Sequence, residues 1–259
     1  MDFEPVNADH AVQSATFSVA FDGPVSPASV QALGRRRDLT SELPAVQNPE
    51  GIELNIAPSG TPAPRRMQGV QLAHLRPDGT PAWALRLMGQ ELAVDCTRYT
   101  RWARIWDTAQ RYLRVGLSVI PSGDRSRKVT VLGHTVVDQF VANRDEYELS
   151  ELLKKSRFMA NLTFEAGPTW HNHVGWFEKG SDSHLWLNQL NVDAIREPNS
   201  GQLLVLVTHN QEVRFAAPLE LTAVDDCLDE TMNKLHSQNK LVLEELLSPE
   251  MSKKIGLGG

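Results

Sequence analysis

The stretch TWHNHVGWF, residues 169–177, contains the side chains best suited to chemistry, because one residue separates two histidines. Side chains alternate between the two faces of a β-strand, so His171 and His173 point the same way and could share a metal ion. Zinc would need at least a third protein ligand. Candidates on or beside neighbouring predicted strands are His134, His184, His209, Asp138 and Asp193. Their spacing does not select among them. We therefore expect no bound metal and structural or surface histidines, with a metal-dependent hydrolase at His171 and His173 as an alternative.

Four further residues are candidates for a ligand pocket. Gly175 interrupts a predicted strand, where a glycine marks a bend, packing beneath a helix, or a close approach of a ligand to the backbone. The segment SHLWLNQLNVD adds Asn188, Gln189 and Asn191. Such amides either satisfy buried backbone groups or line a pocket.

Motifs of covalent catalysis are absent from the sequence, which has no GxSxG, Walker A loop, GxGxxG or HExxH. Cys96 and Cys227 are the only cysteines and form no CxxC, which excludes a structural zinc–cysteine site. Each is expected to be a small buried side chain in a reduced, cytoplasmic compartment. The sequence favours a protein that is not an enzyme and indicates no cofactor.

Charge is distributed unevenly. Residues 98–128 carry eight basic and two acidic side chains, whereas residues 220–250 carry eight acidic and two basic ones. The basic segment is a solvated helix face, a protein contact or a nucleic-acid contact, and it could also meet the acidic segment within the chain or across a homodimer. The predicted binding surface consists of Arg101, Arg104, Arg111, Arg114, Arg125, Arg127 and Lys128.

Hydrophobic periodicity predicts an α+β fold with two long amphipathic helices, over about 98–117 and 225–247. A strand, a helix, three strands and a long helix follow one another twice, with a short helix expected over 145–155. We therefore predict a duplicated β-α-β-β-β-α unit, in which the two helices pack on an antiparallel sheet.

Two halves follow from this order. The first, 1–120, includes a flexible connection over 34–66 that is rich in proline, glycine and charge, and the second is 121–259.

The chain has 259 residues, 41% of them hydrophobic and 22% charged, with a net charge of −6. This composition predicts a globular cytoplasmic protein without a membrane segment. The terminal Gly258-Gly259 is a frayed end or a tail for conjugation.

The stretches VTVLGHTVVDQFV, WHNHVGWFE and LNQLNVD, in this order, resemble a sporadically distributed bacterial family of conserved hypothetical proteins of similar length. The resemblance implies no established reaction, cofactor or catalytic residue. By association it implies a multi-gene system, such as phage defence or toxin–antitoxin. We expect a non-enzymatic binding or scaffold protein, with a partner protein encoded in the same operon. The alternative is a nucleic-acid-binding accessory protein.

Overall fold

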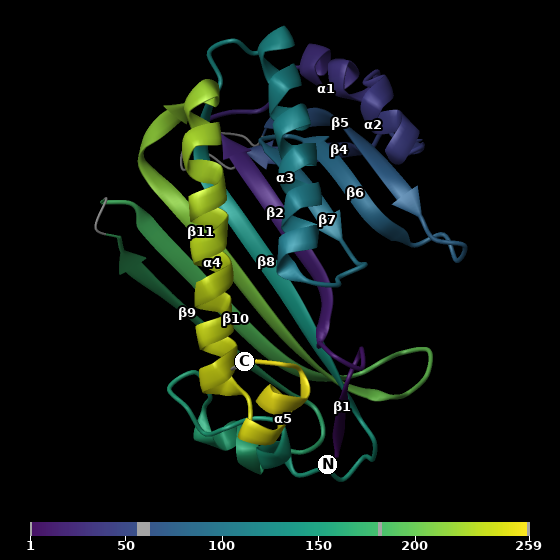
Figure 1. Ribbon diagram of the computed structural model, residues 1–259, viewed down its shortest axis with the longest axis vertical. Helices are drawn as coiled ribbons and strands as arrows, with labels where there is room; N and C mark the ends of the chain where they lie inside the picture. Colours follow the sequence, from purple (N-terminus) through teal and green to yellow (C-terminus); the bar gives the residue numbers. More distant parts are fainter. Residues whose placement is uncertain (1, 56–62, 181–182, 258–259) are drawn as a thin grey trace. The chain divides into compact units, whose positions relative to one another are not determined.

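The computed structural model is α+β, with a large antiparallel sheet, as the sequence predicts (Figure 1). The residues it describes are 2–55, 63–180 and 183–257. They form two compact units: unit 1 is Met1–Ala15, His134–Arg214 and Glu230–Gly259, and unit 2 is Thr16–Gly133 and Phe215–Asp229. Four elements contribute residues to both: β2(Val12–Phe21), β8(Lys128–Ala142), β11(Leu203–Glu220) and α4(Val224–Leu246).

Unit 2 contains most of the first half of the chain. Its strands are β3(Ala45–Gln47), β4(Glu50–Asn55), β5(Ala63–Leu75), β6(Pro81–Met88) and β7(Glu91–Cys96). Its helices are α1(Pro27–Gly34), α2(Arg37–Glu42), α3(Trp102–Val119) and the 3-10 turns η1(Ile120–Ser122) and η4(Leu221–Ala223). The strand order is β3-β5-β6-β7-β2, and β4 also pairs with β5.

Local sequence explains several of these elements. Ser26 caps α1, because its side chain accepts a hydrogen bond from the backbone N–H of Ser29. Gly79 and Gly89, in the turns on either side of β6, adopt positive φ angles that favour glycine. The apolar arc predicted for α3 is buried against β7 and β6, with Ile105 and Trp106 nearly inaccessible. The pattern of the helix therefore follows from the sequence.

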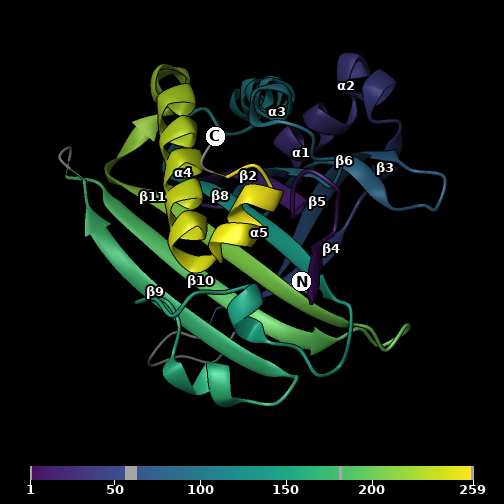
Figure 2. The same cartoon turned by 60° about the horizontal axis from the view of Figure 1, so that its bottom comes forward.

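Unit 1 contains β1(Phe3–Pro5), η2(Leu149–Glu151), η3(Asn161–Glu165), β9(Trp170–Lys179), β10(Leu185–Arg196) and α5(Pro249–Lys254). Its strand order is β8-β11-β10-β9, with β1 beside β8. β9 lies next to β10 at the edge of this order (Figure 2).

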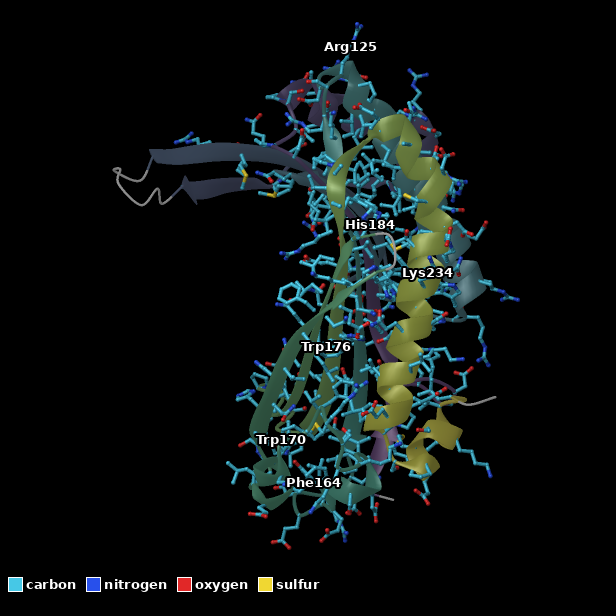
Figure 3. The ribbon with its side chains drawn as sticks, turned by 90° about the vertical axis from the view of Figure 1, so that its left-hand side faces the viewer. Arg125, Phe164, Trp170, Trp176, His184 and Lys234 are labelled. Carbon is cyan, nitrogen blue, oxygen red and sulfur yellow. The ribbon has the colours of Figure 1, made fainter. Side chains whose placement is uncertain are left out.

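The strands of unit 1 have two different faces. On one face, which we call the covered face, Leu190, Val192 and Val207 share an apolar cluster with Val242 and Leu246 of α4. Figure 3 shows α4 running along this side of the strands. We call the opposite face the open face. Its residues on β9 and β10 include His171, His173, Gly175, Phe177, Gln189, Asn191 and Asp193.

The structure differs from the expected elements in two stretches. The helix expected over 145–155 is only the 3-10 turn η2, because this segment bonds elsewhere: Lys154 N–H donates to the carbonyl of Leu246, and Leu153 bridges to Leu247. The connection expected over 34–66 contains α2, β3 and β4, while residues 56–62 lie outside the described residues. The halves 1–120 and 121–259 describe an order along the chain and stay a prediction.

Candidate metal centre

Strand register brings Asp193 to the two histidines. β9 pairs antiparallel with β10, so that His171 lies opposite Asp193 and His173 lies opposite Asn191. Side chains directly opposite one another in an antiparallel pair are about 4.5–5.5 Å apart at Cβ, and long side chains also reach their diagonal neighbours. One carboxylate on β10 can therefore contact both imidazoles on β9.

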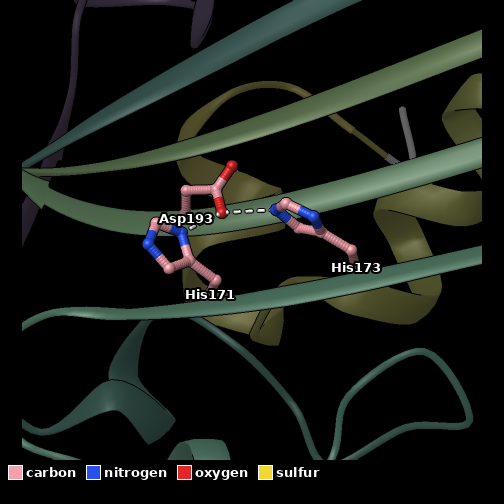
Figure 4. A group of neighbouring side chains, drawn as sticks. All are labelled: His171, His173 and Asp193. Carbon is pink, nitrogen blue, oxygen red and sulfur yellow. Dashed lines mark hydrogen bonds and ion pairs between the residues drawn. The ribbon is translucent and has the colours of Figure 1, made fainter.

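The contacts are close and converge on one oxygen (Figure 4). His171 Nδ1 and His173 Nε2 each lie 2.7 Å from Asp193 Oδ1. A carboxylate oxygen only accepts hydrogen bonds, so each of these nitrogens carries a proton in this arrangement. The three potential ligand atoms all lie within 4.8 Å of one another.

This arrangement is compatible with a metal after small side-chain movements. Tetrahedral zinc with bonds of about 2.0–2.1 Å to its ligands separates neighbouring ligand atoms by roughly 3.3 Å. Each imidazole would withdraw by about 0.6 Å from Asp193 Oδ1 to reach that separation. The side chains of His171 and His173 are 71% and 54% exposed, so neighbouring atoms leave them room to move. The ring nitrogens would have to lose the protons that they donate to Asp193.

The open face continues from this centre as a band of polar groups. Asn210 of β11 donates to the side-chain oxygen of Gln189 at 2.9 Å and accepts from the Thr135 hydroxyl at 2.7 Å. Gly175 lies opposite Gln189 in the register and is exposed. It does not pack beneath a helix, so that explanation of the glycine is wrong.

Asn188 is the one predicted pocket residue that lies elsewhere, because even-numbered residues of β10 face the covered side. It is buried there, and its side-chain oxygen lies 3.2 Å from His209 Nε2. His209 Nδ1 lies 2.9 Å from the side-chain oxygen of Asn239 on α4, and Gln211 Nε2 donates to Asn188. The sequence pattern did not predict this polar cluster; its one signal is Asn239, which interrupts the apolar arc of its helix.

Burial also shifts the titration of groups on the covered face. It lowers the pKa of His134 to about 3 and the pKa of His209 to about 4. His236 on α4 is lowered to a pKa of about 4, first by burial and then by Lys240. Burial raises the pKa of Asp138 to about 7. All four groups are therefore held toward their neutral forms.

The predicted arginine surface is partly neutralised inside unit 2. Two of its ion pairs, Arg114–Asp225 and Lys128–Glu220, join the basic segment to the acidic segment of the same chain. Glu42 holds Arg111 through two hydrogen bonds, of 2.8 and 2.6 Å, while Asp22 and Asp124 pair with Arg127. Arg101 precedes α3 as its N-cap, and Arg104 and Arg125 are exposed. The surface thus offers phosphates less free positive charge than the sequence suggests.

The cysteines add no chemistry to this picture. Cys96 is buried, and burial raises the pKa of its thiol to about 11, so the reactive thiolate is disfavoured. Cys227 is only half-buried, and its thiol lies 3.5 Å from the carbonyl of Val224. Gly258-Gly259 lies outside the described residues.

Among the residues described, no helix has both the length and the apolar character that a membrane crossing requires. Comparison of the chain with models of known families, with curated proteins and with solved structures finds no match.

Proposed function

We propose that the chain is a binding protein that holds one divalent transition-metal ion through His171, His173 and Asp193. The observation that supports this function is the convergence of three potential ligand atoms within 4.8 Å on the open face. The alternative role for the same residues is a pair of histidine–aspartate hydrogen bonds that fasten two strands. The high exposure of both histidines argues against that role, because solvent competes with such bonds and leaves them little net stabilising effect.

The donor set indicates the class of metal. Two imidazole nitrogens with one carboxylate oxygen suit zinc, copper, nickel, cobalt and iron, whereas magnesium and calcium prefer oxygen ligands alone. Three protein ligands also leave at least one coordination position for water or another molecule.

Isothermal titration of tag-free protein with Zn²⁺ tests the proposal. We expect one equivalent to bind, and His171→Ala, His173→Ala and Asp193→Asn each to weaken binding by about 100-fold or more, because each removes a metal ligand. Circular dichroism would establish that the variants keep their fold.

The matched control is His74→Ala, which removes a histidine exposed on β5 in unit 2. This variant should bind Zn²⁺ as the unmodified chain does. Equal weakening by all four substitutions would indicate scattered surface binding and would overturn the proposal, as would a chain that binds no Zn²⁺.

The broader role that we propose is a binding or scaffold module in a bacterial multi-gene system, and its support is the resemblance of the chain to a patchily distributed family. A metal-binding module is compatible with this role. Nucleic-acid binding through the arginine surface receives less support, because ion pairs occupy four of its seven predicted residues.

We also infer that the chain arose by duplication of a β-α-β-β-β-α unit. In the first half, β2 neighbours β7, followed by β6 and β5; in the second, β8 neighbours β11, followed by β10 and β9. A long helix follows the last strand of each set, α3 after β7 and α4 after β11. The matching order of strands and helices in the two halves supports the duplication, although η2 replaces the expected short helix of the second copy.

A further inference from the structure

The candidate metal centre is one-sided, because its three side chains all project from the open face. An ion held there would have the protein on one side and its remaining coordination positions directed toward solvent. Those positions are where a second molecule would bind. What lies beside the centre on the open face then decides which molecules fit.

Gly175 is the next open-face residue along β9, and nothing around it requires a glycine. A Cβ built there would meet only the backbone oxygen of Asn188 at 3.5 Å and Gln189 Cγ at 3.9 Å, which are ordinary contacts. Its φ angle is not among the positive ones. Glycine weakens a strand relative to residues that have a side chain. Its effect here is to leave space on the open face beside His173.

The surroundings of that space have distinct chemistry. Phe177 follows on the same face and is 59% exposed, although apolar side chains of this size are usually buried. On β10, Gln189 lies opposite Gly175 and Asn191 lies opposite His173. The side-chain oxygen of Gln189 accepts a hydrogen bond from Asn210, and this bond does not use the amide N–H groups of Gln189. From the metal ligands outward, the open face therefore offers a gap, an aromatic ring and amide groups along one border.

Charge narrows the class of ligand further. Of the seven residues named for the open face only Asp193 carries a fixed charge, and it is a metal ligand in the proposed centre. Lys179, Glu212 and Arg214 lie on the same face at the level of Phe177 and beyond, and Arg214 pairs with Glu212. Beside Gly175 the metal would therefore be the main attraction for an anionic group. A polyphosphate, which needs several cations along its length, does not fit this arrangement.

We propose that the centre binds a planar aromatic compound bearing paired oxygen donors, of the carboxylate or hydroxamate type. The oxygens occupy the open positions of the metal, and the ring lies across Gly175 toward Phe177, with Gln189 and Asn191 beside its polar edge. This ligand site rests on the metal-binding function proposed above. It assigns a role to Gly175, which the fold itself leaves unexplained.

The test uses Co²⁺ as the metal and two hydroxamates as probes. The visible absorption of bound Co²⁺ reports metal binding first and then the arrival of each hydroxamate. We expect benzohydroxamate to bind the Co²⁺-loaded chain about tenfold more tightly than acetohydroxamate, after correction for the ratio measured with free Co²⁺, because only its ring reaches Gly175 and Phe177.

Two variants locate the ring. Gly175→Val should keep its Co²⁺ affinity and lose the preference for benzohydroxamate, because a branched side chain fills the gap and suits a strand. Phe177→Ala should reduce the preference in part. The control is Gly167→Val, at an exposed glycine with no atoms within 4 Å of a built Cβ, and it should change neither measurement. If Gly175→Val does not fold, Gly175→Ala serves the same comparison.

The outcomes separate the two proposals. A chain that binds no Co²⁺ overturns the metal function and this ligand site together. A chain that binds Co²⁺ but shows the same hydroxamate ratio as free Co²⁺, or an unchanged ratio in Gly175→Val, overturns the ligand site and leaves the metal function standing.

Discussion

Histidines on the two faces of unit 1 illustrate how position decides what a residue type does. On the open face the side chains of His171 and His173 are 71% and 54% exposed, and both contact one carboxylate. On the covered face His134 and His209 are each 1% exposed. His209 is held by Asn188 and Asn239, and Trp176 stacks over its ring with 6.0 Å between centroids.

The difference in burial decides which histidines can act as ligands and which serve the fold. A buried imidazole with a pKa near 4 is neutral at physiological pH, and neighbouring amides already occupy its ring nitrogens. An exposed imidazole beside a carboxylate can exchange its hydrogen bond for a metal ion at little structural cost. The open face is therefore the side of unit 1 on which binding is expected, and the covered face is the side that sets stability.

The largest expected effect tests the contribution of each face to stability. Leu190 on the covered face is fully buried, so Leu190→Ala should lower the free energy of unfolding by about 2–5 kcal/mol. Phe177→Ala on the open face should change it by about 0.5 kcal/mol or less, because the ring is largely exposed. Urea denaturation of both variants measures the difference. Similar losses for the two would mean that Phe177 is packed against other groups as closely as Leu190 is, contrary to its exposure.

The second prediction concerns Asp138 on the covered face. Burial raises its pKa to about 7, so between roughly pH 4 and pH 7 the folded chain binds a proton there that the unfolded chain releases. This group therefore destabilises the fold progressively as pH rises through that window. Asp138→Asn removes the effect, and we expect its stability relative to the unmodified chain to rise by up to about 4 kcal/mol between pH 4 and pH 7.

Urea denaturation at a series of pH values provides the comparison. The lowered pKa values of His134, His209 and His236 also make stability depend on pH in this window, but all three histidines are present in both chains and their effects cancel in the difference. A constant offset from the buried amide is expected at every pH. A difference that stays flat from pH 4 to pH 7 would contradict a buried, proton-retaining Asp138.

The sequence predicted which residues of a strand in unit 1 share a face, but not which residues of two neighbouring strands lie opposite one another. Alternation alone placed His171, His173 and Gly175 together, because the side-chain period of a strand is two. It could not select Asp193 as their neighbour, since that choice depends on the register between β9 and β10, and alternation within one strand does not specify that register. The third member of the candidate site therefore remained one of several carboxylates and imidazoles.

Tertiary contacts also overrode local patterns. The leucines at 149, 152 and 153 have helical spacing, yet all three are buried in the apolar cluster of unit 1. Backbone bonds to Leu246 and Leu247 at the end of α4 replace those that a helix over 145–155 would have made. Such partners lie about 90 residues away in the chain, beyond the reach of periodicity analysis.

The third prediction concerns His209 on the covered face, whose pKa is shifted in the opposite direction to that of Asp138. Burial lowers the pKa of His209 to about 4, so between roughly pH 6.5 and pH 4 the unfolded chain binds a proton that the folded chain refuses. His209 therefore destabilises the fold as pH falls. His209→Gln keeps a group able to bond Asn239 and lacks this titration. The variant should be less stable than the unmodified chain at neutral pH, because the stacking of His209 with Trp176 is gone, and this difference in stability should shrink by up to about 3 kcal/mol on acidification to pH 4.

Thermal or urea unfolding at pH 7, 5.5 and 4 measures the gap in stability between the two chains. A gap that widens toward pH 4 would mean that His209 is charged in the folded chain, and the covered face would then share the chemistry assigned to the open one.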